Sequence, residues 1–272
     1  MIDKLKHIIS NTYKFFHLQN DIVMYKPTPV RWCLFLLLSI GCYGNPLQVS
    51  VSIQGIIPHK SLGFTQGLIF HKGFLYEGTG LHGSSHLYEI TAEDGAIKRS
   101  RQVQQFFGEG ITIINNKLYQ LTWQANQALV YDYPALTLCD TLHYEGEGWG
   151  LTHDTSFLIM SNGSDTLYFR DTAFKVKKKV AVTIQNVPVN HLNELEYAHG
   201  NIYANIWYKN YILKINPQSG KTISKIDCTP LFQIEQPAKK EQVLNGIAYN
   251  HHKNTFYLTG KHWKYIFEVS IP

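Results

Sequence analysis

The chain has few charged residues and few cysteines for its length. Asp, Glu, Lys and Arg make up 17% of the 272 residues, and there are four cysteines. Residues 175–179 are the one Lys-rich stretch, and we interpret them as a solvated strand edge or turn, so we expect no nucleic acid partner. The apolar run at residues 32–41 is well short of the ~20 residues that span a bilayer.

Several kinds of reactive site are also missing. The sequence has no Ser/His/Asp arrangement, no glycine-rich loop that would hold phosphates, and no Cys/His spacing suited to zinc. The 13 histidines are scattered, mostly in turns such as those at His71 and His199. We therefore predict neither a metal centre nor a cofactor.

Residues 1–44 have the features of an export leader. Lys26 and Arg31 precede the apolar run, as in a signal peptide, and Met24 is a possible true start. The end of the run resembles a bacterial lipoprotein cleavage box, in which Cys42 becomes the lipidated first residue and a possible membrane anchor. The alternative is ordinary secretory cleavage near Gly44. Both predict a periplasmic or secreted protein.

The remaining chain has an ordinary surface charge and two cysteines. Without residues 1–41 the net charge falls from +5 to +2. Cys139 and Cys228 lie in separate repeats, and two free, buried thiols are favoured over a disulfide bridge. We expect residues 47–272 to form a single domain and a monomer.

A local pattern occurs five times at nearly even spacing. Each copy has a polar or aromatic anchor residue, a short apolar strand, a turn and a returning strand. Consecutive anchors are 40 to 51 residues apart, which is typical of the blades of a β-propeller. The anchors are Gln66, Glu109, Trp149, Glu194 and Asn245.

The first copy illustrates the strands of a blade. Residues 67–70 form a strand, residues 71–73 a turn in which Gly73 suits a positive φ, and residues 74–78 the returning strand. A third strand with alternating apolar residues follows in every copy. We therefore predict an all-β fold, a five-bladed β-propeller.

Closing such a ring usually requires the far end of the chain to complete one blade. Residues 49–53 alternate like a strand and precede the first anchor. We expect this N-terminal strand to pair beside residues 269–271 and so to remove an exposed edge. Truncation at either end should then destabilise the whole ring.

The hairpins predict where a site forms. The anchor before the first strand and the residue after the second strand lie at the same rim of a blade. These ten positions should therefore converge on one mouth, a cup with tryptophan walls that suits small ligands or chain ends. The residues after the second strands are Gly80, Trp123, Asn162, Trp207 and Lys261.

Glu109 is the best candidate for acid–base chemistry in this cup. It lies between two glycines and follows two phenylalanines. A carboxyl group beside apolar rings tends to have a raised pKa that suits proton transfer near neutral pH. The alternative is a structural carboxylate that bonds the neighbouring blade. For Trp123, Trp149 and Trp207 the alternative is packing between blades.

Short motifs along the chain point to a family. They are FTQGL (64–68), FGEGIT (107–112), GEGWGLT (146–152), LNELE (192–196), NIWYKNYILKINPQSGK (205–221), LNGIAY (244–249) and LTGKHWKYIFEV (258–269). Together they resemble the plant and bacterial type of glutaminyl-peptide cyclotransferase, also called glutamine cyclotransferase. The resemblance covers every blade. It implies a five-bladed propeller, unrelated in fold to the zinc-dependent animal enzymes of the same activity.

The resemblance also implies a reaction and a set of site residues. An N-terminal glutaminyl residue of a peptide or protein becomes pyroglutamate, and ammonia is released. Glu109 is assigned as base toward the ammonium and then as acid toward the leaving group. Candidate donors to the oxyanion are Lys261, Gln66, Asn193 and an indole N–H. The aromatic residues that would enclose the substrate are Phe64, Phe107, Trp123, Trp149 and Trp207.

The sequence departs from the family pattern at two positions, and two other functions stand as alternatives. Lys60 stands where an Asp often follows the preceding histidine, and Asn162 stands where Asp is frequent, which leaves open how the peptide beyond its first residue is held. One alternative function is a non-catalytic propeller that binds peptide N-termini or a protein. The other is a calcium-dependent hydrolase of the lactonase kind, for which only Glu109 and Glu194 occupy anchors.

Overall fold

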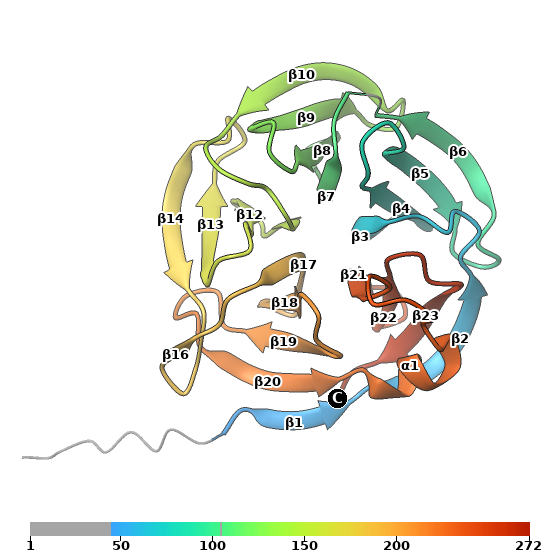
Figure 1. Ribbon diagram of the computed structural model, residues 1–272. Coiled ribbons are helices and arrows are strands. Elements are labelled where there is room, and N and C mark those ends of the chain that lie inside the picture. Colours follow the sequence, from blue (N-terminus) through green and yellow to red (C-terminus); the bar gives the residue numbers. More distant parts are fainter. Residues whose placement is uncertain (1–44, 104) are drawn as a thin grey trace, which may run out of the picture. The chain divides into compact units, whose positions relative to one another are not determined.

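A computed structural model describes residues 45–103 and 105–272, whose strands form five blades around a central axis (Figure 1). This confirms the predicted five-bladed β-propeller. The predicted leader, with Cys42 and the possible start at Met24, lies outside the described residues.

Each blade is a sheet whose strands follow one another from the axis outward. Blade I consists of β3 (Thr65–His71), β4 (Phe74–Thr79), β5 (His86–Thr91) and β6 (Ile97–Gln102). Blade II consists of β7 (Gly108–Ile114), β8 (Lys117–Thr122), β9 (Gln127–Asp132) and β10 (Thr137–His143). Blade III consists of β11 (Leu151–His153), β12 (Leu158–Met160), β13 (Thr166–Arg170) and β14 (Val176–Ala181).

The last two blades follow the same order and are joined by a short helix. Blade IV consists of β17 (Leu192–Ala198), β18 (Asn201–Ile206), β19 (Tyr211–Ile215) and β20 (Thr222–Asp227). Blade V consists of β21 (Leu244–Asn250), β22 (Thr255–Gly260), β23 (Tyr265–Ser270) and β2 (Ser52–Pro58). The other elements are β1 (Leu47–Ser50), the hairpin of β15 (Thr183–Ile184) and β16 (Val187–Pro188), and α1 (Thr229–Glu235).

Two N-terminal strands close the ring. β2 pairs antiparallel with β23 and completes blade V, with Ser52 opposite Ser270. β1 runs parallel to β20 at the outside of blade IV, with Leu47 opposite Ser224. Closure by an N-terminal strand is therefore confirmed, but residues 49–53 are divided between the two strands. The strand that completes blade V extends to Pro58, because Ile57 pairs with Ile266 and is buried.

Apolar side chains pack between neighbouring blades rather than within one blade. Ile69 and Leu87 of blade I, for example, form a cluster with Ile111 and Leu118 of blade II. Each of the five core clusters combines residues of two adjacent blades. Burial of apolar area therefore stabilises the closed ring as a unit. The tight turns agree with prediction, since Gly73 has a φ of 88°.

Glycines next to the anchors bring the innermost strands into backbone contact. A Cβ atom on Gly110 would lie 2.5 Å from the Leu151 nitrogen, and one on Gly150 would lie 2.0 Å from the Asn193 oxygen. Both distances are too short for any side chain. The repeated glycine after the anchor is thus explained by the close approach of blades II, III and IV at the axis.

The described residues contain two free cysteines and one short helix. Cys139 and Cys228 are both free, as expected, and Cys228 is buried. Cys139 is exposed, contrary to the prediction of two buried thiols, because it lies on the outer strand β10. Among the helices that the described ranges contain, none has the length and apolar character needed to cross a membrane.

Candidate active site

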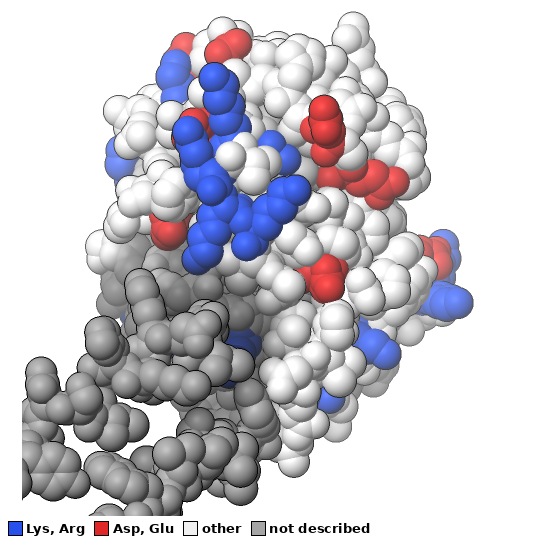
Figure 2. All heavy atoms as spheres, turned by 90° about the vertical axis from the view of Figure 1, so that its left-hand side faces the viewer, with Lys and Arg blue, Asp and Glu red and all other residues white. Residues whose placement is uncertain are grey.

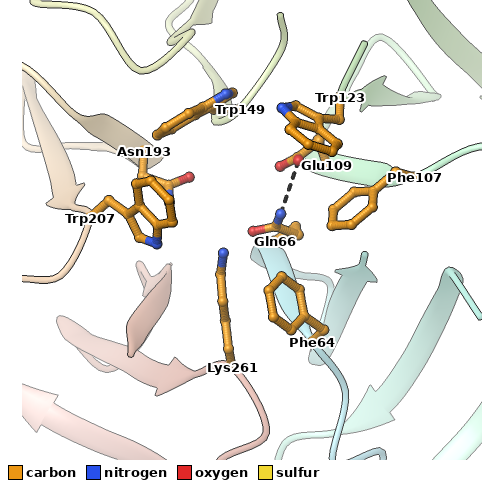
Figure 3. Close-up of a pocket in the computed structure, with 9 residues that line it drawn as sticks. All are labelled: Phe64, Gln66, Phe107, Glu109, Trp123, Trp149, Asn193, Trp207 and Lys261. Carbon is orange, nitrogen blue, oxygen red and sulfur yellow. Dashed lines mark hydrogen bonds between the residues drawn. The ribbon is translucent and has the colours of Figure 1, made fainter. Parts of the chain in front are cut away.

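One pocket lies at the axis, where the inner strands of the blades meet. Its volume is about 210 Å³. Aromatic rings form most of its wall, and four polar side chains point into it (Figure 3). The residues that line it are Phe64, Gln66, Phe107, Glu109, Trp123, Trp149, Asn193, Trp207 and Lys261. The structure thus brings together all nine residues that the sequence predicts for the site.

β-Bulges near the start of the inner strands place the polar side chains. The pairing register shifts between Thr65 and Gly67 in β3, and again between Gly108 and Ile111 in β7. Gln66 and Glu109 therefore lie at positions without a cross-strand partner. β17 has a similar shift that contains Asn193. A bulge re-aims the side chains it contains, and here it leaves these three beside the pocket.

Not every rim position faces the pocket, which corrects the expectation that all ten converge there. Gly80 lies under the ring of Phe107, and Asn162 lines a different hollow. Glu194 is buried, and its Oε1 accepts the backbone N–H of Leu68 at 3.2 Å. Asn245 is also turned inward and donates from Nδ2 to Gln66 Oε1 at 3.1 Å. The bulge in β17 presents Asn193 to the pocket in place of Glu194.

Glu109 is a buried carboxyl group with few hydrogen-bond partners. It is 3% exposed, and its Oε1 accepts a hydrogen bond from Gln66 Nε2 at 2.9 Å. Its Oε2 is buried and has no partner in the described part of the chain. Burial raises the pKa of Glu109 well above 4.5, against the opposing charge of Lys261 and with a further increase from the Glu147 charge.

Lys261 is the only cation among the residues that line the pocket, and it lies opposite Glu109 (Figure 3). Its side chain is 5% exposed, and its Nζ is 4.3 Å from the centre of the Phe64 ring. Burial lowers the pKa of Lys261 to about 8, although the charge of Glu109 opposes that shift. A cation at this place can stabilise negative charge that develops in the pocket.

The aromatic wall consists of two groups of contacting rings. In the first, the Phe107 ring centre is 6.0 Å from Phe64 and 5.4 Å from Trp123. In the second, Trp149 and Trp207 meet edge to face with centres 5.4 Å apart. Such contacts favour defined ring orientations. The pocket is therefore small and apolar, with a preset shape.

Glu147 joins these two groups of rings, and the sequence reasoning missed it. Its Oε2 accepts both the Trp123 indole N–H at 3.0 Å and the Trp149 indole N–H at 2.9 Å. Partial burial would raise the pKa of Glu147, but hydrogen bonds from Gln124, Trp149 and Trp123 outweigh it and lower the pKa below 4.5. The signal was present, because Glu147 repeats the Gly-Glu-Gly pattern of residues 108–110 two residues before Trp149.

These contacts limit which side chains can donate a hydrogen bond to the oxyanion of a substrate. Trp123 and Trp149 already donate their indole N–H groups to Glu147. Trp207 makes no indole hydrogen bond within residues 45–103 and 105–272, so it is the indole left to donate to a ligand. Asn193 has a buried, unpartnered Oδ1, which is an acceptor, so only its Nδ2–H group can act as a donor. Gln66 is held between Glu109 and Asn245, so its contact with Glu109 orients that carboxyl group.

Comparison with known proteins decides the family. A sequence profile described as glutamine cyclotransferase matches residues 39–271. The chain belongs to the glutamine cyclotransferase family. The glutaminyl-peptide cyclotransferase of Arabidopsis thaliana is 32% identical over 239 residues, which cover 84% of this chain and 75% of that protein.

A solved structure supports the same family. The crystal structure of Myxococcus xanthus glutaminyl cyclase superimposes with a TM-score of 0.79 at 34% identity. The match covers 83% of this chain and 98% of the Myxococcus chain. The resemblance drawn from the motifs is therefore confirmed over the whole propeller. No group of three or more potential metal ligands occurs among the described residues of this glutamine cyclotransferase.

Proposed function

We propose that this glutamine cyclotransferase converts N-terminal glutaminyl residues of peptides or proteins into pyroglutamate, with Glu109 as the group that transfers the proton. The activity follows from the family and from the Arabidopsis relative, which is named a glutaminyl-peptide cyclotransferase. One observation supports the role of Glu109 above the others. It is a buried carboxyl group with one oxygen held by Gln66 and the other without a partner, beside an apolar pocket.

The reaction requires proton transfers at two nitrogens, the α-nitrogen that attacks and the amide nitrogen that leaves. The α-nitrogen of the substrate must lose a proton before it attacks the side-chain amide carbon. The new C–N bond closes the ring, the bond to the amide nitrogen breaks, and that nitrogen must gain a proton to leave as ammonia. Glu109 takes the first proton and gives it to the leaving nitrogen. Its carboxylate then accepts the second proton, which the ring nitrogen loses on becoming the lactam N–H, and passes it to the released ammonia. A raised pKa suits both steps near neutral pH.

Negative charge develops on the amide oxygen during the attack. Lys261 supplies a positive charge in a buried setting, where electrostatic stabilisation is stronger than in water. The Trp207 indole N–H and the Nδ2–H group of Asn193 are the neutral donors that we assign to the same oxygen. Gln66 acts through Glu109 by holding one of its oxygens.

The aromatic wall contributes by position. A free glutamine side chain is extended in most of its conformations, whereas ring closure requires it to fold back on its own amine. The aromatic rings that line the pocket of about 210 Å³ can hold the side chain in this folded form. Holding reacting atoms near the attack geometry can supply a large part of a rate enhancement. This is the role that we assign to Phe64, Phe107, Trp123, Trp149 and Trp207.

The test is ammonia release from a glutaminyl dipeptide, with the cyclised product identified by mass spectrometry. We expect turnover that a chelator leaves unchanged. Glu109→Gln should lower turnover by about 10²–10⁴-fold, with folding intact by circular dichroism. Glu145→Gln, an exposed carboxylate close to the pocket loop, serves as the control and should keep full activity. Retained turnover in Glu109→Gln would refute the role of Glu109.

We also propose that the protein is exported and acts as a monomer. The leader at residues 1–44 supports export, with either cleavage near Gly44 or lipidation at Cys42. Mass spectrometry of the mature N-terminus separates these outcomes, and a retained leader would contradict both. Light scattering of the purified protein tests the monomer.

A further inference from the structure

A second hollow lies between blades II and III, outside the pocket. Its volume is about 580 Å³. We call it the interblade groove and define it by six of the residues that line it, which are His143, Tyr144, Asn162, Arg170, Lys175 and Lys179. Glu145 is the only carboxylate among its lining residues. The groove therefore has an excess of positive charge.

Arg170 is a buried cation that forms no ion pair with a carboxylate of residues 45–103 or 105–272. It is 6% exposed, and Nη1 donates to the Phe174 carbonyl oxygen at 2.7 Å. Its Nε is buried without a hydrogen-bond partner in the described part of the chain. The guanidinium carbon lies 5.0 Å from the ring centre of Phe174 and 5.6 Å from that of Tyr144. Aromatic faces offset part of the cost of burying this charge, but its attraction for an anion remains.

Two lysines extend the positive charge to the surface of the groove. Lys175 and Lys179 are exposed and line it, and Lys179 Nζ is 5.3 Å from the Tyr168 ring. Figure 2 shows Lys and Arg gathered on this side of the molecule, the side of blade III in Figure 1. Lysines on an outer strand such as β14 also discourage edge pairing. That role does not explain the buried Arg170.

The groove begins next to the active site. Asn162 lines it, and the following residue, Gly163, lies so close to the Trp149 ring that a Cβ there would be 2.7 Å away. Trp149 itself lines the pocket, and its backbone N–H donates to Ser161 at 3.0 Å. On the other side of the groove, Tyr144 and Glu145 lead into the loop of Glu147. Trp149 thus lines the pocket and packs against Gly163, the residue that follows Asn162 at the edge of the groove.

We propose that the interblade groove is a substrate subsite, which binds an acidic side chain a few residues after the N-terminal glutamine. This rests on the proposed function. A peptide whose first residue fills the small pocket must leave over its rim, and each extended residue advances about 3.3–3.6 Å. A chain that leaves over Trp149 then brings its next side chains to the groove. Lys175 and Lys179 contact the carboxylate, and Arg170 adds its charge from a low-dielectric wall.

The experiment uses alanine-rich peptides that begin with glutamine and contain one glutamate, moved stepwise away from the N-terminus. We expect kcat/KM to rise about fivefold over the all-alanine peptide when the glutamate reaches one particular position, and the rise to shrink with salt. A lysine at that position should lower kcat/KM. A flat profile along the series would overturn the proposal.

Variants connect the preference to the groove. Lys175→Gln combined with Lys179→Gln should remove the preference for the acidic peptide and leave turnover of glutamine amide unchanged. Lys178→Gln is the matched control, because Lys178 is on the same strand but donates to the Pro217 oxygen and does not line the groove. A preference that survives the double substitution would contradict the subsite. If the wild-type protein does not turn over glutamine amide, that result would instead contradict the proposed function.

Discussion

Two buried carboxyl groups lie in neighbouring blades of this propeller and have opposite properties. Glu77 in β4 is fully buried and accepts hydrogen bonds from His59 at 3.0 Å, Ser61 at 2.6 Å and Thr65 at 2.7 Å. Glu109 in β7 is almost as buried but accepts, from the described residues, only one hydrogen bond, from Gln66. The difference between the two sites is therefore the supply of donors and not the degree of burial.

The pKa values move in opposite directions for this reason. Burial raises the pKa of Glu77, but the positive charge and hydrogen bond of His59, with those of Ser61 and Thr65, outweigh it and lower the pKa below 4.5. At Glu109 burial wins and the pKa rises. Hydrogen-bond donors on both oxygens favour the ionised form of a carboxyl group. A buried carboxyl group with one oxygen that lacks a donor exchanges its proton nearer to neutral pH.

The position of each group matches its properties. His59 follows β2, and its Nδ1 is 3.0 Å from the carbonyl oxygen of Trp263. Thr65 Oγ1 also contacts the Gly260 oxygen at 3.3 Å. Glu77 thus joins blade I to the segments that close blade V. Glu109, by contrast, faces the pocket. Among the described residues, its one side-chain hydrogen bond to another blade is that from Gln66 of blade I.

Replacing Glu109 by glutamine should produce the largest effect on activity. General acid–base catalysis contributes about 10²–10⁴-fold, so we expect kcat to fall by about that factor. Stability should not fall. Above pH 4.5 the unfolded chain loses this proton before the folded chain does, so the native carboxyl group costs stability as pH rises, and glutamine removes that cost. Ammonia release and thermal unfolding at pH 8 measure the two effects.

Replacing Glu77 by glutamine should do the reverse. Breaking a buried ion pair costs about 3–5 kcal/mol of unfolding free energy, whereas kcat of the folded fraction should be unchanged. Burial would lower the pKa of His59, but Glu77 outweighs it and raises that pKa above 6.5. The pair therefore stabilises most between pH 4.5 and 6.5, less as pH falls through the lowered Glu77 pKa, and less as pH rises through the raised His59 pKa.

Chemical denaturation of Glu77→Gln across pH tests this window. Asp94→Asn provides the control, since the Asp94 carboxylate is exposed and lies 3.9 Å from the exposed Lys60. It should change the unfolding free energy little at any pH. An equal loss in both variants would show that Glu77 has no special role in closing the ring.

Lys261 should show a smaller catalytic effect with a distinct pH signature. If its charge stabilises the oxyanion, Lys261→Met loses about 10²–10³-fold in kcat. In the wild type kcat should decline above about pH 8, where Lys261 loses its proton. Lys261→Arg keeps a permanent charge, so the decline should move to higher pH. An unchanged alkaline limb in that variant would assign the decline to another group.

Glu147 should have the smallest effect of the four. Glu147→Gln weakens the contacts to Trp123 and Trp149, and we expect KM to rise about tenfold as the wall loses its preset shape. Its charge also raises the pKa of Glu109, so the acid limb of kcat/KM should move to lower pH. Glu145→Gln, two residues away and exposed, is the control and should leave both quantities unchanged when the substrate is a dipeptide, which is too short to reach the interblade groove.

Much of the fold and the pocket could be predicted because the repeat is local. The anchor and the glycine after it recur wherever an inner strand meets its neighbour, which is why Gln66 and Glu109 were found from spacing alone. The residues implied by the family, such as Asn193 and Phe64, line the same pocket. Where one period of sequence corresponds to one blade, position along the chain predicts position around the axis.

The rest depends on contacts that spacing does not encode. The bulge in β17 exchanges Glu194 for Asn193 at the pocket, and a bulge shifts register without any mark in the periodicity. Glu147 lies in a loop, and its role appears only when Trp123 is brought to it from blade II. The helix α1 was likewise not expected. It is fixed by a contact distant in sequence, because its Glu235 carboxylate accepts the backbone N–H of Lys264 at 2.9 Å.

The most direct test of this account is the titration of the two carboxyl groups themselves. Carbon-13 NMR of side-chain carboxyls, with Glu109→Gln and Glu77→Gln used to assign the signals, reports each pKa in the folded protein. We predict that Glu109 titrates well above 4.5 and Glu77 below 4.5. A Glu109 signal that titrates at or below 4.5 would contradict the claim that this carboxyl group is poised to carry the proton.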